Sequence, residues 1–161
     1  MKETELTFRY AVKEDVPLIL DFIHKLASYE KVPDAVAATK ELLEEWIFDK
    51  QRAEVLFAMA DGKEVGFSFF YQTFPAYLGH GGIYIDDLYI DPIYRGKGYG
   101  KVLLQQMAKI ALERGCQRLE WCYLNWNQSS INFYLSMGAT PLDECTSYRV
   151  TGDALVNMLK K

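Results

Sequence analysis

A run of alternating glycines and basic residues near the middle of the chain could bind a phosphate group. It reads Arg95-Gly96-Lys97-Gly98-Tyr99-Gly100 and leads directly into the apolar-periodic stretch 102–112. The first N–H groups of a helix have no partner inside the helix, and the helix dipole places partial positive charge there. Glycines let the backbone approach a phosphate without a Cβ in between, and Arg95, Lys97 and Lys101 add positive charge. The run therefore predicts a pyrophosphate cradle.

The spacing of these glycines differs from two common phosphate-binding motifs. A P-loop requires GxxxxGK[ST], which the sequence does not contain, and the dinucleotide fingerprint GxGxxG differs from the G-x-G-x-G spacing found here. A glycine-rich turn that only joins a strand to a helix is the alternative, because glycine is common in turns. The spacing alone leaves the phosphate ligand open.

The composition is that of an ordinary globular protein. With 161 residues, 50% of them hydrophobic and 25% charged, the chain predicts a single domain, 1–161. A net charge of −4 argues against a nucleic-acid partner and is compatible with a cationic substrate. No apolar run reaches the length of a signal peptide or a membrane span. Three cysteines without CxxC spacing predict reduced thiols, so we expect a cytoplasmic protein.

Hydrophobic periodicity predicts strands and helices along the whole chain. Strands are expected at 6–11, 53–60, 64–73, 83–90, 118–124 and 147–150, and helices at about 14–27, 39–48, 102–112, 127–137 and from 151. Asp61-Gly62 is a strong hairpin signal, and Thr39 is a suitable N-cap. The order of elements predicts an α/β fold built on one sheet of mixed direction.

The connection between two of these strands indicates where a ligand lies. Strand 83–90, helix 102–112 and strand 118–124 form a βαβ unit, so the two strands should be parallel. Ligands of open α/β sheets bind at the carboxyl ends of the strands, where the glycine run stands. The helix expected to begin at Asn127 opens at the same end. We therefore expect the site between residues 86–90, the glycine run and residues 121–127.

Two motifs at this end of the sheet occur together in one known family. Arg95, Gly98 and Gly100 form an Arg-x-x-Gly-x-Gly pattern, and the stretch 127–139 pairs an Asn at a helix start with a downstream Tyr and Gly. The chain thereby resembles the GCN5-related N-acetyltransferases (GNAT), which use acetyl-CoA. The branch of spermidine/spermine and thialysine acetyltransferases is the most similar, and the stretches that carry this similarity are 26–30, 85–89, 126–127 and 130–134.

The resemblance implies a fold, an activity and an assembly. The fold is a GNAT acyl-CoA N-acyltransferase fold, with helices on both faces of a mixed sheet and a splayed parallel strand pair that holds CoA. The activity is direct transfer of acetyl from acetyl-CoA to the primary amine of a small cationic substrate in a ternary complex, without a metal. A homodimer is the assembly expected for this branch. An acceptor lysine or N-terminus on a protein, and a non-catalytic acetyl-CoA sensor, are the alternatives.

The amine must be bound as a cation and then lose a proton. An aliphatic ammonium has a pKa of ~10.4, so only about one molecule in 10³ is nucleophilic at pH 7. Asp86 or Glu30 could bind the cation and accept its proton, directly or through water, and Tyr29 and Asp87 complete the expected amine site. In a regular strand Asp87 points to the face opposite Asp86, and a bulge would change this.

The departing CoA thiolate needs a proton, and a tyrosine is a suitable acid. Tyr134 lies seven residues after Asn127, hence on the same helical face, and the resemblance places the family's acid there. A backbone N–H near Leu88 would polarise the thioester carbonyl. The residues expected to bind the cofactor are Leu88, Tyr89, Ile90, Arg95, Gly96, Lys97, Gly98, Tyr99, Gly100, Lys101, Asn127, Ser130 and Tyr134.

The sequence departs from the family pattern in two places. Asp86 stands where close relatives often carry a glutamate, and the stretch 143–148 has Thr146 and Tyr148 where relatives place acidic residues and a tryptophan. Both departures bear on the identity of the amine rather than on the chemistry. His24 and His80 are isolated and give no metal-ligand spacing.

Overall fold

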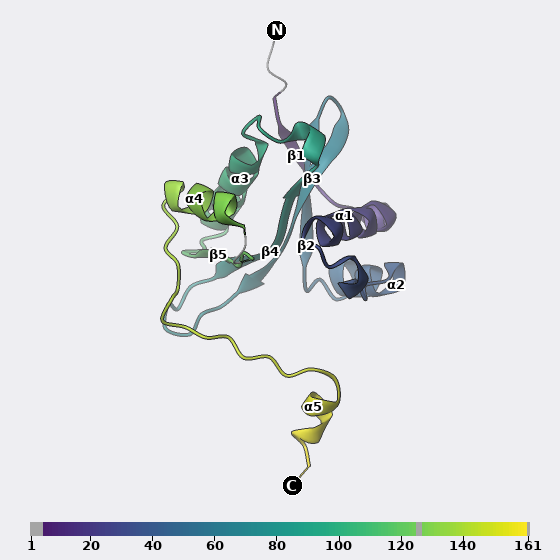
Figure 1. Ribbon diagram of the computed structural model, residues 1–161, viewed down its shortest axis with the longest axis vertical. Helices are drawn as coiled ribbons and strands as arrows, with labels where there is room; N and C mark the ends of the chain where they lie inside the picture. The colour runs from purple at the N-terminus through teal and green to yellow at the C-terminus, as the bar shows by residue number, and fades with distance from the viewer. Residues whose placement is uncertain (1–4, 125–126, 161) are drawn as a thin grey trace. The chain divides into compact units, whose positions relative to one another are not determined.

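Residues 5–124 and 127–160 are described in the computed structural model of the chain (Figure 1). The chain divides into two compact units, residues 1–122 and 123–161, and each is treated by itself below. The prediction of one domain, 1–161, stays a prediction. Trp126, which belongs to the family resemblance, lies outside the described residues. No helix in the described ranges is long and apolar enough to span a membrane.

The first unit is a five-stranded mixed sheet. Its elements are β1 (Thr7–Tyr10), α1 (Val16–Tyr29), α2 (Lys40–Leu43), β2 (Glu54–Ala60), β3 (Lys63–Thr73), β4 (Gly82–Ile90), α3 (Tyr99–Glu113) and β5 (Leu119–Trp121). The strands lie in the order β1-β2-β3-β4-β5. The first four are antiparallel to their neighbours and β5 is parallel to β4, which confirms the mixed sheet and the parallel pair.

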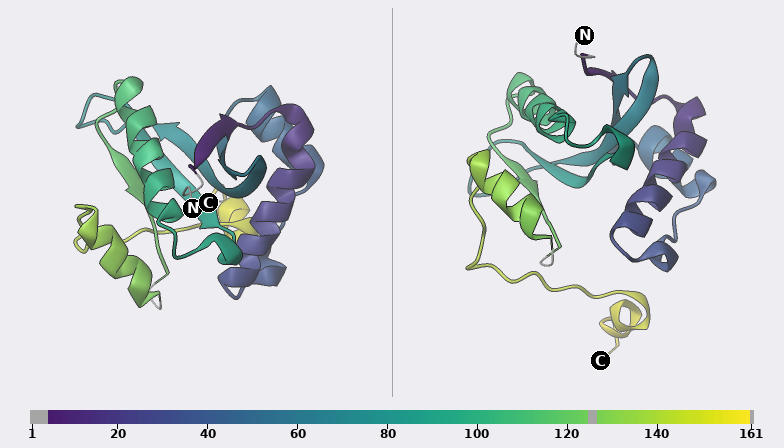
Figure 2. Two further views of the ribbon diagram at one scale, coloured as in Figure 1. Left: turned by 90° about the horizontal axis from the view of Figure 1, so that it is seen from above. Right: turned by 45° about the horizontal axis from the view of Figure 1, so that its top comes forward.

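Helices cover both faces of this sheet. Figure 2 shows α1 and α2 on one face and α3 on the other. On the α1 face, the periodic residues Ile19, Phe22 and Leu26 are buried and pack against Phe57 and Phe67 of the sheet. This stripe was expected from the sequence, because residues three and four apart share one face of a helix.

Local signals in the sequence are confirmed by the backbone. Asp61 and Gly62, which join β2 to β3, have φ angles of 51° and 73°, as a type I′ hairpin turn requires at both positions. The Thr39 hydroxyl accepts a hydrogen bond from the backbone N–H of Leu42 at 3.2 Å, so it caps α2. After α2 the chain continues as a π-helical turn, Glu44–Asp49.

Strand β4 contains a bulge at Asp86. Its partner strand β3 pairs Phe70 with Ile85 and the preceding Phe69 with Asp87, so Asp86 is an extra residue without a partner in the ladder. Residues directly opposite on neighbouring strands share one face of a sheet, and Phe69 packs on the α1 face. The bulge therefore turns Asp87 toward α1. In a regular strand, the side chains of Asp86 and Asp87 would point to opposite faces of the sheet.

The second unit consists of α4 (Gln128–Ser136) and α5 (Gly152–Asn157) with irregular chain between them. Both helices were expected from the sequence. The strand expected at 147–150 was wrong: these residues are exposed and have irregular backbone. The prediction rested on the alternating apolar residues Tyr148 and Val150. A strand also needs a neighbouring strand with which to form hydrogen bonds, and alternation alone does not provide one.

Candidate active site

The glycine run forms an open turn at the start of α3. Gly96 and Gly98 have φ angles of 78° and 77°, a left-handed conformation that side chains disfavour, and Gly98 is the N-cap of α3. A Cβ built on Gly96, Gly98 or Gly100 would meet no atom within 4 Å. Open space thus lies against backbone at the positive end of a helix dipole, where the first N–H groups lack an intrahelical acceptor. This geometry fits a phosphate group.

Lys97 and Lys101 flank this turn, and both are exposed. The Lys97 ammonium lies 5.5 Å from the ring centre of Tyr94. Tyr99, the first residue of α3, is buried, so its side chain anchors the helix. Because the side chain is buried, only the backbone of Tyr99 is available to contact a phosphate.

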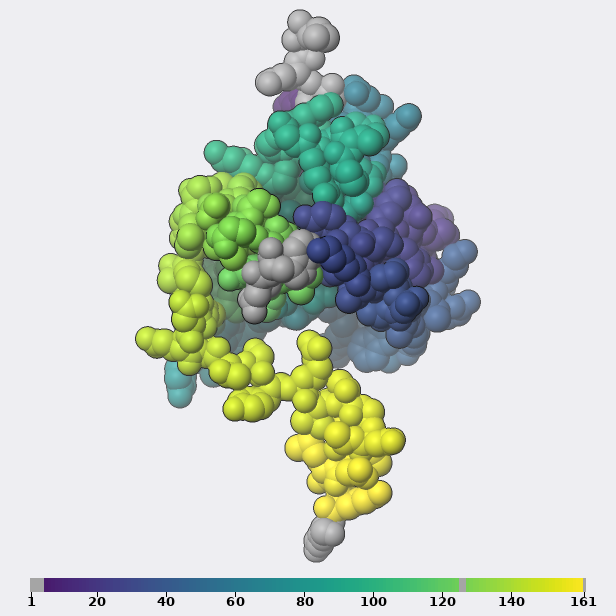
Figure 3. Space-filling view, viewed as in Figure 1, coloured from purple at the N-terminus to yellow at the C-terminus, as the bar shows by residue number. Residues whose placement is uncertain are grey.

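Arg95 links the glycine turn to the end of α1. Its guanidinium carbon lies 4.2 Å from the ring centre of Tyr29 and 5.3 Å from that of Tyr89, and its Nε donates a hydrogen bond to the Ile90 carbonyl at 2.9 Å. A cation over an aromatic face is stabilised by the ring quadrupole. The space-filling view shows the dark-blue end of α1 bordering the teal segment that contains this turn (Figure 3). The sequence predicted Arg95 as a phosphate ligand but gave no sign of this stacking.

The carboxyl half of β4 is free of β5 in the described ladder. Pairing with β5 covers Ile83 to Ile85, whereas pairing with β3 continues to Ile90. The stretch from Leu88 to Ile90 was expected to bind the pantetheine arm through its backbone, as an added strand would. The side chain of Tyr89 packs in the core, so only its backbone is available for that expected role.

Three carboxyl groups interact electrostatically where the bulge of β4 meets the end of α1. Glu30 is the C-cap of α1, and Asp86 and Asp87 form the bulge. Burial raises the pKa of Asp86 and of Glu30, and the negative charge of Asp86 raises that of Glu30 further. Burial, followed by the charges of Asp86 and Glu30, raises the pKa of Asp87 to about 7. The structure therefore brings together three of the four residues predicted to bind the amine, and Tyr29 immediately precedes Glu30.

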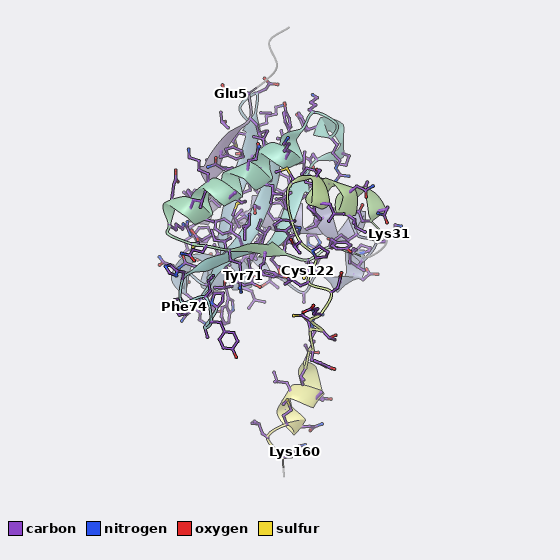
Figure 4. The ribbon with its side chains drawn as sticks, turned by 90° about the vertical axis from the view of Figure 1, so that its left-hand side faces the viewer. Glu5, Lys31, Tyr71, Phe74, Cys122 and Lys160 are labelled. Carbon is purple, nitrogen blue, oxygen red and sulfur yellow. The ribbon has the colours of Figure 1, made fainter. Side chains whose placement is uncertain are left out.

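A pair of tyrosines lies beside these carboxyls. The rings of Tyr71 and Tyr84 are stacked, with centres 5.3 Å apart, and the Tyr84 hydroxyl is hydrogen-bonded to the Cys122 sulfur at 2.8 Å. Burial and then this hydrogen bond raise the pKa of Tyr84; burial and then the charge of Asp86 raise the pKa of Tyr71. Figure 4 labels Tyr71 and Cys122. No role was predicted for Tyr71 from the sequence. In β3 this residue stands two positions after Phe69, so alternation places both on the α1 face of the sheet.

In the second unit, α4 carries the predicted acid. Asn127 is the N-cap residue of α4, and its side-chain oxygen accepts a hydrogen bond from the Ser129 hydroxyl at 3.1 Å. The ring of Tyr134 lies 6.3 Å from Tyr123 and 5.5 Å from Phe133, centre to centre. Ser130 lies on the same helix. The roles of Asn127, Ser130 and Tyr134 stay predictions.

The described residues contain no group of three His, Cys, Asp or Glu side chains that could hold a metal ion.

Replacing Asp87 by asparagine is expected to stabilise the protein more at high pH than at low pH. Because the folded pKa of Asp87 lies near 7 and the unfolded value near 3.8, the unfolded state loses this proton first, and the free energy of unfolding falls as pH rises from about 4 to 7. An amide side chain carries no such proton. The advantage of Asp87→Asn should grow over this range, to roughly 1–2 kcal/mol after solvent screening, and level off above it. Urea unfolding at a series of pH values measures it, and a pH-independent difference would contradict the buried carboxyl.

The chain is similar to known proteins over most of its length. The model of the acetyltransferase (GNAT) family matches residues 20–139. A thialysine N-epsilon-acetyltransferase of Sus scrofa is 32% identical over 95% of this chain and 96% of its own length. An L-ornithine N5-acetyltransferase of Arabidopsis thaliana is 30% identical over 91% of this chain and 85% of its own.

A solved structure extends the similarity to the fold. An integron cassette protein from the mobile metagenome of V. cholerae superposes with a TM-score of 0.80 and 29% identity, over 99% of this chain and 100% of the other. The family uses acetyl-CoA as its co-substrate. From the matched family model and these relatives, the chain belongs to the GNAT family and is an acetyl-CoA-dependent N-acetyltransferase.

Proposed function

We propose that this enzyme acetylates a primary amine of a small cationic substrate, either a diamine or polyamine or a lysine-like amino acid. The observation that carries the proposal is the group formed by Glu30, Asp86 and Asp87, in which burial, and then the negative charge of Asp86, raises the pKa values of the other two carboxyls. A bound ammonium would relieve this repulsion, because an opposite charge nearby favours the ionised carboxylate.

The proposed reaction is direct attack in a ternary complex. The ammonium gives its proton to Asp86 or Glu30, directly or through a water molecule, and the free amine attacks the thioester carbonyl of acetyl-CoA. A backbone N–H near Leu88 stabilises the oxyanion. The N–C bond forms, the C–S bond breaks, and Tyr134 donates its phenolic proton to the departing thiolate.

The acetyl-CoA site in this proposal has two parts. The pyrophosphate lies against Gly96, Gly98 and Gly100 at the start of α3, and Lys97 and Lys101 add positive charge beside it. The pantetheine arm pairs with the backbone of Leu88–Ile90. Open space at each of the three glycines and the free carboxyl half of β4 support these placements.

The similar proteins favour small amines as acceptors. The names of the two relatives above specify thialysine and L-ornithine, each for that relative. Both are amino acids with an amine at the end of the side chain. The same resemblance favours a cytoplasmic homodimer, which sedimentation of the purified chain and cell fractionation would test.

The experiment is release of free CoA thiol from acetyl-CoA with one panel of acceptors. The panel holds spermidine, spermine, putrescine, lysine, thialysine and a lysine-containing peptide. Turnover with at least one small amine, at a kcat/KM well above that of the peptide, is the expected result. Turnover with the peptide alone would replace the proposal with a protein acceptor, and no turnover with any acceptor would contradict it.

A further inference from the structure

A cavity of about 580 Å³ opens in the first unit, beside the end of β3. Val55 and Tyr71 line it from the sheet, and Phe48, Gln51 and Arg52 line it from the chain that follows the π-helical turn. Val55 packs on the α1 face of the sheet. Val55 therefore places part of the cavity on the face of the sheet toward which the bulge turns Asp87. Tyr10 and Glu54, which form hydrogen bonds with Arg114, line it from the other face.

The register of the strands gives the separation between the cavity and the carboxyls. Val55, Phe69 and Asp87 are direct neighbours across β2, β3 and β4, so Val55 lies about 10 Å from Asp87 at two strand spacings. Tyr71 lies two residues beyond Phe69, or about 7 Å along β3. Arg52 stands three residues before Val55, so a substrate that reaches it from Asp87 must be extended and carry a polar group at each end.

The charges lining the cavity leave it positive. Glu54 also lines it, but both oxygens of its carboxylate accept hydrogen bonds from Arg114, at 2.7 and 2.8 Å. Arg52 lies within 4 Å of no carboxylate in the parts of the chain that the structure describes. Its planar guanidinium is well suited to bind a carboxylate through two parallel hydrogen bonds.

The backbone that carries Arg52 is held in an uncommon conformation. The π-helical turn Glu44–Asp49 precedes it, and Gln51 has a φ of 52°. The Arg52 backbone N–H donates a hydrogen bond to the Trp46 carbonyl at 2.8 Å. This bond holds the segment that follows the π-helical turn against that turn. π-Helical turns and left-handed non-glycine residues are enriched at functional sites, and here they place Gln51 and Arg52 on the cavity wall.

We propose that this cavity binds the carboxylate end of the substrate and that Arg52 is the residue that recognises it. The inference rests on the proposed function and narrows it: the acceptor is an α-amino acid with a primary amine at the end of its side chain. The ammonium binds at Glu30, Asp86 and Asp87 while the α-carboxylate binds at Arg52. A polyamine has no group for Arg52 and brings a second cation to a positive cavity.

The test compares amino acids with the diamines that lack only the carboxylate. Lysine is paired with 1,5-diaminopentane and ornithine with putrescine, and kcat and KM are measured for each with the full-length chain. The wild type should prefer the amino acid of each pair by roughly 10-fold or more in kcat/KM. Arg52→Ala should raise KM for the amino acid roughly 10- to 100-fold, as expected for losing a charged hydrogen-bonded pair, and leave the diamine unchanged.

Two further variants separate recognition from a general effect. Arg52→Lys keeps the charge without the planar fork and should restore part of the amino acid preference. Lys109→Ala removes an exposed cation on α3 and should change neither substrate. A wild type that prefers the diamine, or an Arg52→Ala variant that weakens both members of a pair equally, would overturn the inference while leaving the small-amine function intact. Turnover of the peptide alone would overturn the proposed function itself.

Discussion

Tyr134→Phe is expected to lower kcat roughly 10²- to 10⁴-fold, the range for losing a positioned general acid. A phenol has a pKa of about 10 and is protonated at neutral pH, so it can donate to a departing alkyl thiolate. Phenylalanine keeps the ring and its packing beside Phe133 but has no proton to give. The dissociation constant of acetyl-CoA should stay within about 2-fold of the wild type, because the acid acts on the transition state rather than on the bound cofactor. Steady-state kinetics and a direct binding measurement give the two numbers.

Tyr123→Phe is the matched control for this change. Tyr123 lies in the same unit, and the centre of its ring is 6.3 Å from that of Tyr134. The substitution removes a phenolic hydroxyl in the same way, but Tyr123 has no predicted role in the reaction. Its kcat should stay near that of the wild type. An unchanged kcat in Tyr134→Phe would remove Tyr134 as the acid, and a large loss in both variants would indicate a packing effect of the aromatic pair.

Asp86→Asn is expected to lower kcat/KM for the amine roughly 10²-fold or more at pH 7, because both cation binding and the exit of the proton depend on the carboxylate. The loss should shrink as pH rises, since the fraction of free amine grows about tenfold per pH unit below its pKa of ~10.4. A plot of log kcat/KM against pH should therefore approach unit slope in the variant. A uniform loss at all pH values would indicate binding alone.

Glu30→Gln decides between the two candidates for the proton exit. Burial raises the pKa of both carboxyls, and the charge of Asp86 raises that of Glu30 further, so each accepts a proton more readily than a free carboxylate. The variant that shows the pH-dependent recovery identifies the residue that leads the proton away. The other should mainly raise KM for the amine, as expected for a lost ion pair.

Periodicity predicted most of the fold because the relevant interactions are local. The I′ turn at Asp61-Gly62, the cap at Thr39 and the buried stripe of α1 each follow from residues close together in the sequence. The glycine turn before α3 was likewise predicted from the residue types, and glycine at positions 96 and 98 permits the positive φ angles observed there.

Features that depend on a partner strand could not be predicted. The alternation from Ile83 to Ile90 is compatible with a regular strand or a bulged one, and only the pairing with β3 decides that Asp87 shares a face with the α1 helix. The same holds for the late strand at 147–150, which alternates but is irregular. Arg52 went unnoticed because its cavity is formed by chain segments far apart in the sequence.

The contact between Arg95 and Tyr29 has a consequence for redesign of this enzyme. Tyr29 is adjacent to Glu30, which is proposed to bind the amine, and its ring supports Arg95, which leads into the glycine turn proposed to bind the cofactor. A library that randomises the end of α1 to accept a new amine will also alter the support of that turn. Selections for new acceptors should therefore keep an aromatic residue at position 29 and vary its neighbours.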